Sequence, residues 1–231
     1  MSEEPISVYV VGGCDFSFVR LFRQYGWRKA YTMDKAKIIL FTGGEDVTPA
    51  YYDEEKLSVT HNNPARDKFE LGEYTKALTT DALIIGICRG GQFLNVMNGG
   101  KMWQDVDRHT RTHELVDLVS GQSIMVTSTH HQMMRPTSNA KIIATARESS
   151  RKVSSRRIWT PHGTFPGMYG GNDVIESNVQ DSVDYEVVYY ENTGCLCFQP
   201  HPEYLSVPTT AEYFYKVVNR ILKQGEQTCA A

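Results

Sequence analysis

The sequence predicts an α/β fold of three layers, in which helices cover both faces of a doubly wound, mostly parallel sheet. Through the first 100 residues, short apolar runs typical of buried strands alternate with amphipathic helical segments. The run at residues 82–85 has no polar residue, as expected of a strand in the middle of a parallel sheet. After residue 100 the strand-like runs are separated by turns, which predicts antiparallel hairpins added to this sheet.

Apolar residues at helical or strand spacing place the expected elements in order. In the first half we expect strands at residues 6–11, 37–41 and 82–85, and helices at residues 15–25, 67–80 and from about 90 onward. In the second half we expect extended pieces at residues 114–119, 123–127, 141–146, 185–190 and 195–198, and a closing amphipathic helix at 209–223.

Length and composition narrow the class of protein. At 231 residues the chain can bury one large core, and we expect a single domain over residues 1–231. A net charge of −3 gives no reason to expect nucleic acid as a partner, and apolar runs shorter than ten residues give none to expect a membrane span. The acidic start does not resemble a secretory signal. Five cysteines without framework spacing fit a reducing compartment, so we expect a cytoplasmic protein.

The sequence GICRG at residues 86–90 joins the apolar strand to a helical pattern. This is the layout of a nucleophile elbow that carries a thiol in place of a hydroxyl. The glycines at positions 86 and 90 allow a tight turn, in which strained backbone at Cys88 exposes the sulfur. The helix that follows directs its positive end toward the sulfur and favours the thiolate. Cys88 is therefore the candidate nucleophile, and the alternative is an inert core cysteine.

A base for this thiol is found in the sequence QPHPE at residues 199–203, which follows a short apolar strand. If that strand lies beside the elbow strand, His201 at its end can reach the sulfur of Cys88. Glu203 is then placed to hold the other imidazole nitrogen and to stabilise the cation that forms. The sequence thus predicts a catalytic triad of Cys88, His201 and Glu203.

Six motifs occur in one order along most of the chain. They are FTGGEDVTPAYY at 41–52, ARDKFE at 65–70, GICRGGQFLNVMNGGKMWQD at 86–105, TSTHHQ at 127–132, YEVVYY at 185–190 and CFQPHPE at 197–203. Together they resemble the class I glutamine amidotransferase superfamily, and most of all its γ-glutamyl hydrolase branch, which includes γ-glutamyl-γ-aminobutyrate hydrolase (peptidase C26). The resemblance implies a flavodoxin-like fold and no metal or organic cofactor.

The resemblance also implies a role for individual residues. Cys88 attacks a γ-carboxamide carbon to form a γ-glutamyl thioester that water then cleaves, with His201 as base and then acid. Backbone N–H groups of Gly44 and Arg89 form the oxyanion hole. The implied substrate contacts are Gly43, Gln92, Ser128, Thr129, His130 and His131. The chain departs from the usual pattern at Thr127, where relatives carry asparagine.

Two interpretations of the activity remain open. One is a stand-alone hydrolase of a γ-glutamyl amide, either glutamine or a γ-glutamyl conjugate, which the single-domain length favours. The other is a glutaminase subunit that delivers ammonia to a separate synthetase. A non-catalytic protein on the same fold is disfavoured because the whole predicted triad is present. The expected partners are a small γ-glutamyl substrate, a synthetase in the second case, and a second copy of the chain in a homodimer.

Four other groups of residues have alternative interpretations. Residues 148–183 begin with basic side chains and continue with turn formers and aromatics, so we expect a lid, a contact patch or a solvated loop. Cys195 and Cys197 have no second pair to complete a metal site, which places them in the core. His109 and His113 lack the glutamate of the H-E-x-x-H motif, so we expect them at the surface.

The last of these groups lies at the start of the helix expected before the elbow strand. Arg66, Asp67 and Glu70 fit either a charged, salt-bridged helix start or a set of substrate contacts.

Overall fold

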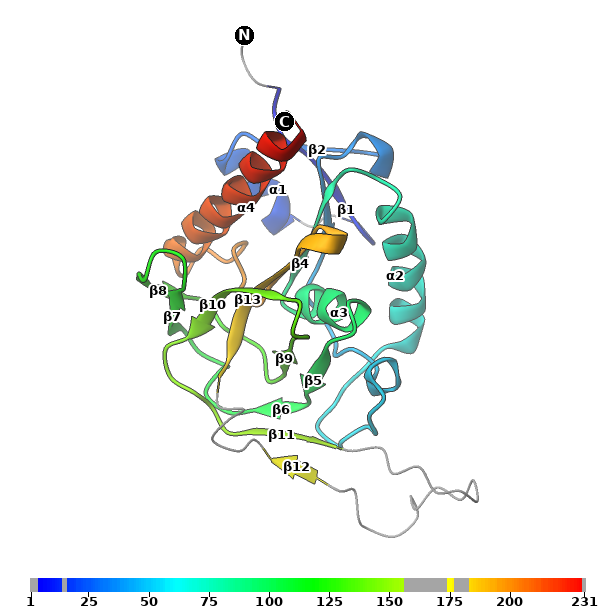
Figure 1. Ribbon diagram of the computed structural model, residues 1–231, viewed down its shortest axis with the longest axis vertical. Coiled ribbons are helices and arrows are strands. Elements are labelled where there is room, and N and C mark those ends of the chain that lie inside the picture. The colour runs from blue at the N-terminus through cyan, green and yellow to red at the C-terminus, as the bar shows by residue number, and fades with distance from the viewer. Residues whose placement is uncertain (1–3, 14–15, 156–173, 177–182, 230–231) are drawn as a thin grey trace.

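The computed structural model of the chain describes residues 4–13, 16–155, 174–176 and 183–229 (Figure 1). The helices are α1 (Phe16–Gln24), α2 (Pro64–Ala77), α3 (Arg89–Met97) and α4 (Pro208–Cys229), with short 3₁₀ helices η1 (Met33–Lys35), η2 (Pro49–Tyr52) and η4 (Glu191–Thr193). They lie on both sides of a large central sheet, which confirms the predicted α/β class.

The main sheet combines a parallel half with an antiparallel half. Its strands, in spatial order, are β2 (Arg28–Lys29), β1 (Ser7–Val10), β3 (Ile38–Phe41), β4 (Leu83–Ile87), β14 (Cys195–Phe198), β13 (Tyr185–Tyr190), β10 (Lys141–Ala146), β7 (His113–Asp117) and β8 (Ser123–Val126). Neighbours from β2 to β14 are parallel, and neighbours from β14 to β8 are antiparallel. The added antiparallel strands are therefore as predicted.

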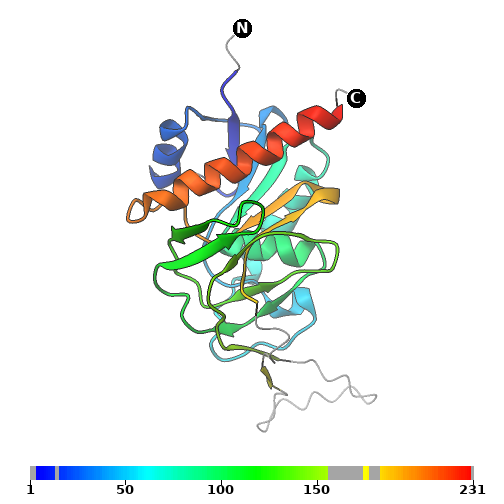
Figure 2. The same ribbon diagram turned by 60° about the vertical axis from the view of Figure 1, so that its left-hand side comes forward.

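Each face of the sheet is covered by its own pair of helices. In β3, Ile38 and Leu40 face α1 and α4, whereas Ile39 and Phe41 face α2 and α3, because successive side chains of a strand point to opposite faces. Figure 2 shows α4, in orange to red, lying across the first of these faces. Among the residues that the structure describes, no helix is both long enough and apolar enough to cross a membrane.

Helix α2 begins three residues earlier than the apolar pattern predicts. The side chain of Asn63 accepts a hydrogen bond of 3.2 Å from the backbone N–H of Arg66, which makes Asn63 the N-cap. Pro64 occupies the first helical position, where the N–H that proline lacks would be unpaired in any case. The cap, rather than the first apolar residue, therefore sets this boundary.

Several short strands were not predicted, and most of them have only two or three residues, too few to show a periodic pattern. They are β2, β5 (Lys101–Trp103), β6 (Asp105–Val106), β9 (Met133–Arg135), β11 (Lys152–Ser155) and β12 (Val174–Glu176). β11 pairs with β6 and β12 in a second sheet, so the expectation of a loop over residues 148–183 is wrong where β11 and β12 lie. Residues 156–173 and 177–182 of that segment lie outside the described residues, and so does most of the expected lid.

Candidate active site

Cys88 occupies the turn between β4 and α3 with a strained backbone. Its φ of 51° and ψ of −115° are unfavourable for a residue with a side chain. A Cβ atom on Gly86 would lie 2.3 Å from the carbonyl carbon of Gly90, and one on Gly90 would lie 2.3 Å from the carbonyl oxygen of Phe41. Close backbone approach thus requires both glycines, and the chain forms the tight strand-to-helix turn of a nucleophile elbow.

The strand that carries His201 lies directly beside the elbow strand. β14 pairs in parallel with β4, with Phe198 opposite Ile87, and the backbone N–H of Cys88 donates to the carbonyl of Phe198 at 2.8 Å. A Cβ atom built on Gly43 would lie 3.0 Å from Cε1 of His201 and 3.6 Å from Cβ of Cys88. The structure therefore brings the thiol and the imidazole together beside the turn at residues 43–44.

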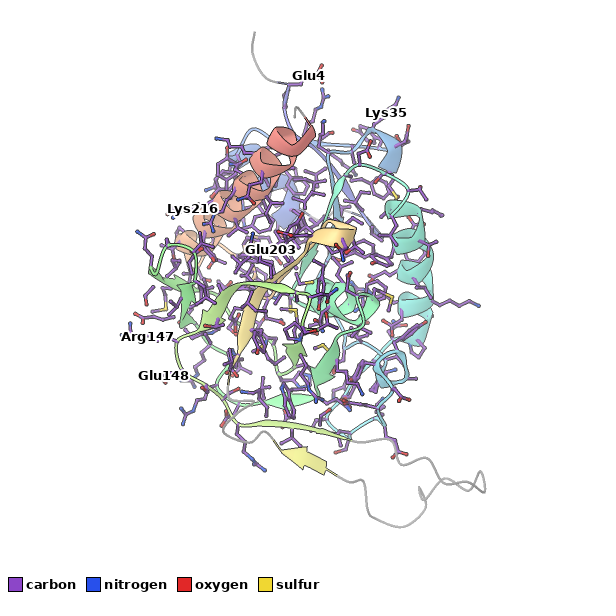
Figure 3. The ribbon with its side chains drawn as sticks, in the orientation of Figure 1. Glu4, Lys35, Arg147, Glu148, Glu203 and Lys216 are labelled. Carbon is purple, nitrogen blue, oxygen red and sulfur yellow. The ribbon has the colours of Figure 1, made fainter. Side chains whose placement is uncertain are left out.

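His201 is held as a cation between a carboxylate and the thiol. Its Nδ1 lies 2.7 Å from Oε1 of Glu203, and both residues are 5% exposed. Burial lowers the pKa of His201, but hydrogen bonding with Cys88 and Glu203 outweighs burial and raises that pKa to about 10. At neutral pH the ring is therefore an imidazolium, which stabilises a neighbouring thiolate. Figure 3 shows Glu203 well inside the outline of the molecule.

Three further side chains fix the positions of His201 and Glu203. The hydroxyl of Thr127 accepts from the backbone N–H of His201 and donates to its carbonyl, both at 2.9 Å. The ring of Tyr204 stacks on the His201 ring with centroids 4.4 Å apart, and Arg20 donates to the carbonyl of Glu203 at 3.1 Å. Sequence reasoning did not assign these roles, because each contact except that of Tyr204 joins segments far apart in the chain.

The turn that carries Gly44 is held by Arg66. Gly44 has a φ of +145°, and a Cβ atom there would lie 1.9 Å from Nη1 of Arg66. Nη2 of Arg66 donates to the carbonyls of Thr42 and Gly43 at 3.0 Å each, and its Nε donates to Glu70 at 2.8 Å. The backbone geometry of the predicted oxyanion turn thus depends on one guanidinium.

Glu70 links this turn to the elbow. The buried guanidinium of Arg89, the first residue of α3, forms ion pairs with Asp67 and Glu70. Because Glu70 also binds Arg66, the Gly44 turn and the start of α3 are fixed relative to each other through one carboxylate. The salt-bridged interpretation of Arg66, Asp67 and Glu70 therefore fits their contacts, although Asp67 and Glu70 are buried rather than solvated.

The predicted substrate contacts have different environments. Gln92 is buried, and its amide nitrogen donates to the carbonyl of Gln132 at 3.2 Å and to the side chain of Gln199 at 3.3 Å. Thr129 is exposed. His131 is half-exposed, and a hydrogen bond with Asp46 raises its pKa. These side chains thus differ widely in their freedom to meet a substrate.

His130 and Ser128 turn toward a different group of residues. The hydroxyl of Ser128 donates to the carbonyl of His109, and Nε2 of His130 lies 3.8 Å from Glu186. Burial lowers the pKa of His130 to about 3, so its ring is neutral at physiological pH. The side chains of these two residues are therefore engaged away from the predicted role in binding substrate.

The expectation that His109 and His113 lie at the surface is wrong. His109 is 2% exposed and His113 is partly buried, and both lie against Glu186 of β13. The acidic partner lies more than 70 residues away in the chain, so local spacing gave no sign of it. Cys195 and Cys197 are fully buried free thiols in the core, as predicted.

Comparison with known proteins identifies the family. A sequence profile of the peptidase C26 family matches residues 26–155, more than half of the chain. The glutamine amidotransferase-like protein YvdE of Lactococcus lactis is 41% identical over 96 residues, which cover 40% of this chain and 39% of that protein. The glutamine amidotransferase-like protein RP404 of Rickettsia prowazekii is 24% identical over 198 residues, covering 73% of this chain and 70% of that protein. The chain thus spans about two fifths of the Lactococcus relative.

Solved structures show the same fold at low sequence identity. A Thermoplasma acidophilum protein described as one of the subunits of GMP synthase superposes with a TM-score of 0.61 at 14% identity, over 98% of both chains. PurLQS from Thermotoga maritima superposes with a TM-score of 0.58 at 14% identity, over 94% of this chain and 99% of that one. By its profile match and its fold, the chain belongs to the peptidase C26 family, within the class I glutamine amidotransferase superfamily.

Proposed function

We propose that the protein is a cysteine hydrolase that cleaves the amide bond of a γ-glutamyl compound. One observation carries the proposal: a strained cysteine at the start of a helix meets an imidazolium that a buried carboxylate holds from its other side. This arrangement provides a nucleophile, a proton donor and an orienting anion. Membership of the peptidase C26 family and the motif resemblance support the γ-glutamyl substrate class.

The proposed reaction has two steps. The thiolate of Cys88 attacks the amide carbon, and the imidazolium of His201 gives its proton to the departing nitrogen as the carbon–nitrogen bond breaks. The product is a γ-glutamyl thioester and free amine or ammonia. A water molecule then gives a proton to the neutral His201 and attacks the thioester carbon, which releases glutamate and the thiolate.

The oxyanion that forms in each step needs hydrogen-bond donors fixed in advance. The backbone N–H groups of Gly44 and Arg89 are the candidates, because one belongs to the turn beside His201 and the other to the first residue of α3. The ion pairs of Glu70 with Arg66 and Arg89 support this role, since they hold both backbone segments in place.

A glutaminase subunit that passes ammonia to a synthetase is the second candidate. It is favoured by the descriptions of two proteins of the same fold, the GMP synthase component and PurLQS. The two functions differ in what the isolated chain does. A stand-alone hydrolase turns over γ-glutamyl conjugates by itself, whereas a glutaminase subunit is slow with glutamine until its partner is added.

A panel of γ-glutamyl amines and glutamine, incubated with the purified chain alone, distinguishes these functions. We expect release of glutamate from at least one conjugate, measured by mass spectrometry of the products. Turnover of glutamine alone, and only in the presence of a copurifying synthetase, would favour the glutaminase subunit. No turnover of any panel member under either condition would contradict the proposed function.

Replacing Glu203 with glutamine is expected to change the pH dependence of the reaction. With the carboxylate present, His201 stays protonated to about pH 10, so the alkaline limb of kcat/KM should lie near that value. Removing the carboxylate anion lowers the pKa of His201. The alkaline limb of the kcat/KM profile of Glu203→Gln should therefore lie roughly one to three pH units lower than that of the parent. We also expect kcat at pH 7 to fall about 100-fold. An alkaline limb that does not move would contradict the role of Glu203.

Replacing Arg66 with lysine is expected to lower kcat about tenfold or more, with little change in KM. Lysine keeps the charge but cannot donate at once to the two carbonyls of the Gly44 turn and to Glu70, so the oxyanion donor is misplaced. The matched control is Lys68→Ala, which removes an exposed cation from the same helix and should leave kcat unchanged. Equal kcat values for the two variants would show that Arg66 does not position the turn.

A further inference from the structure

A cluster of histidines around one carboxylate lies apart from the proposed triad. His109 follows β6, His113 begins β7, His130 follows β8, and Glu186 belongs to β13. Nδ1 of His109 and Nε2 of His113 each lie 3.3 Å from Oε1 of Glu186, and Nε2 of His130 lies 3.8 Å from the same oxygen. Four chain segments thus aim their donor atoms at one region of space.

These donor atoms are buried, and within the described residues they have no hydrogen-bond partners. This holds for the three ring nitrogens that face the carboxylate and for both oxygens of Glu186. Buried polar atoms are normally hydrogen-bonded, because leaving them unpaired after desolvation is costly. These ring nitrogens lie close to a carboxylate oxygen but do not have the geometry of hydrogen bonds to it. The nitrogens and the carboxylate oxygen are therefore directed at a common point that lies between them.

The opposite sides of two rings are anchored as in known metal sites. Nε2 of His109 lies 2.8 Å from Oδ2 of Asp184, and Asp184 is itself paired with the buried ammonium of Lys152. Nδ1 of His130 lies 2.9 Å from the carbonyl of Gln132. A histidine that binds a metal usually donates its other N–H to a carboxylate or a backbone carbonyl, which fixes the tautomer and the direction of the ring.

The distances from Glu186 to His109 and His113 match those around a tetrahedral ion, and His130 lies slightly farther out, 3.8 Å from the same oxygen. Bonds from zinc to nitrogen or oxygen of about 2.0 to 2.1 Å require donor atoms about 3.3 to 3.4 Å apart. The distances from Oε1 of Glu186 to Nδ1 of His109 and to Nε2 of His113 are both 3.3 Å. The ligand atoms of His109, His113 and Glu186 all lie within 4.8 Å of one another. Imidazole together with one carboxylate suits a divalent transition-metal ion better than calcium or magnesium, which prefer oxygen ligands.

We propose that His109, His113, His130 and Glu186 bind one divalent transition-metal ion of the zinc type. Because the protein supplies four ligands, the site is closed and its role is structural rather than catalytic. His109 and His113 also line a surface cavity of about 520 Å³, which gives the ion a way in. Figure 3 shows Arg147 and Glu148, which line the same cavity, at the outer edge of the molecule.

The ion would stabilise the stretch that follows β8. The carbonyl of Gln132 accepts from both His130 and Gln92, and the hydroxyl of Ser128 donates to the carbonyl of His109. Fixing His109 and His130 on one ion therefore limits the movement of residues 127–132 and of Gln92. The metal site does not depend on the proposed hydrolase function, because its occupancy is measured without a substrate.

Zinc titration of tag-free protein tests the proposal. The chain is treated with a chelator and titrated calorimetrically with Zn²⁺ in a Cys88→Ala background, which removes the proposed active-site thiol as a competing ligand. A parallel titration with Co²⁺ reports the geometry through its visible absorption. We expect one Zn²⁺ per chain and the intense Co²⁺ spectrum of a four-coordinate site. No binding of either ion would overturn the proposal.

Variants of the cluster locate the bound ion. In this background, His113→Ala and Glu186→Gln should weaken Zn²⁺ binding by at least about 100-fold, and Asp184→Asn by about 10- to 100-fold. The matched control His61→Ala removes an exposed histidine and should bind as the parent does. If a ligand variant fails to fold, Asp184→Asn decides, because it keeps every proposed ligand. Affinity unchanged in the folded cluster variants would place the ion elsewhere and contradict the assignment.

Discussion

Replacing Cys88 with alanine is expected to lower kcat for a γ-glutamyl amide by at least about 10⁴-fold, because no other group can take the place of the nucleophile. The elbow should persist without the sulfur, since its geometry is set by close backbone contacts at Gly86 and Gly90. The measurement is steady-state turnover by the chain alone, with thermal melting as a check that the variant is folded.

Cys195→Ala is the matched control for the loss of a thiol. Cys195 is a buried free cysteine at the start of β14, at the other end of the strand from His201. It should keep nearly full activity even if its melting temperature falls. A folded Cys88→Ala protein with more than a few per cent of the parental activity would show that the thiol is not the nucleophile.

Replacing His201 with glutamine is expected to lower kcat by about 10³- to 10⁴-fold, because the ring serves first as acid and then as base. The imidazolium also stabilises the proposed thiolate of Cys88. Alkylation of Cys88 by iodoacetamide at pH 7, followed by mass spectrometry, should therefore slow in His201→Gln. A merely structural role for His201 would not slow alkylation in a variant that melts at the parental temperature.

The control for this variant is His61→Gln, which changes an exposed histidine and should leave both kcat and the alkylation rate unchanged. Rapid alkylation together with full turnover in folded His201→Gln would contradict the pairing of His201 with Cys88. Lost turnover with normal alkylation would limit His201 to proton transfer.

Features within a short stretch of the chain were the most predictable. The elbow could be predicted because a buried strand, two glycines and a helix follow one another around Cys88, and each has its own pattern. The convergence of Cys88 and His201 required one more step, that β14 lies beside β4. Parallel strands end at one edge of the sheet, so the ends of those two strands had to meet there.

Side-chain networks between distant segments could not be predicted in the same way. Arg66, Glu70 and Arg89 could be read as a charged helix start, but nothing local indicated that Glu70 binds both arginines. The histidine cluster was not predicted for a similar reason. The H-E-x-x-H pattern places two histidines one turn apart on a helix, whereas the cluster combines two loops, the start of β7 and β13.

The most direct test of the proposed function is to capture the covalent intermediate. The protein is mixed with excess γ-glutamyl substrate, quenched in acid during steady-state turnover, digested and analysed by mass spectrometry. We expect the mass of one γ-glutamyl group on the peptide that carries Cys88, and none in Cys88→Ala. Turnover in which the γ-glutamyl group is found on a residue other than Cys88 would contradict a thioester on Cys88.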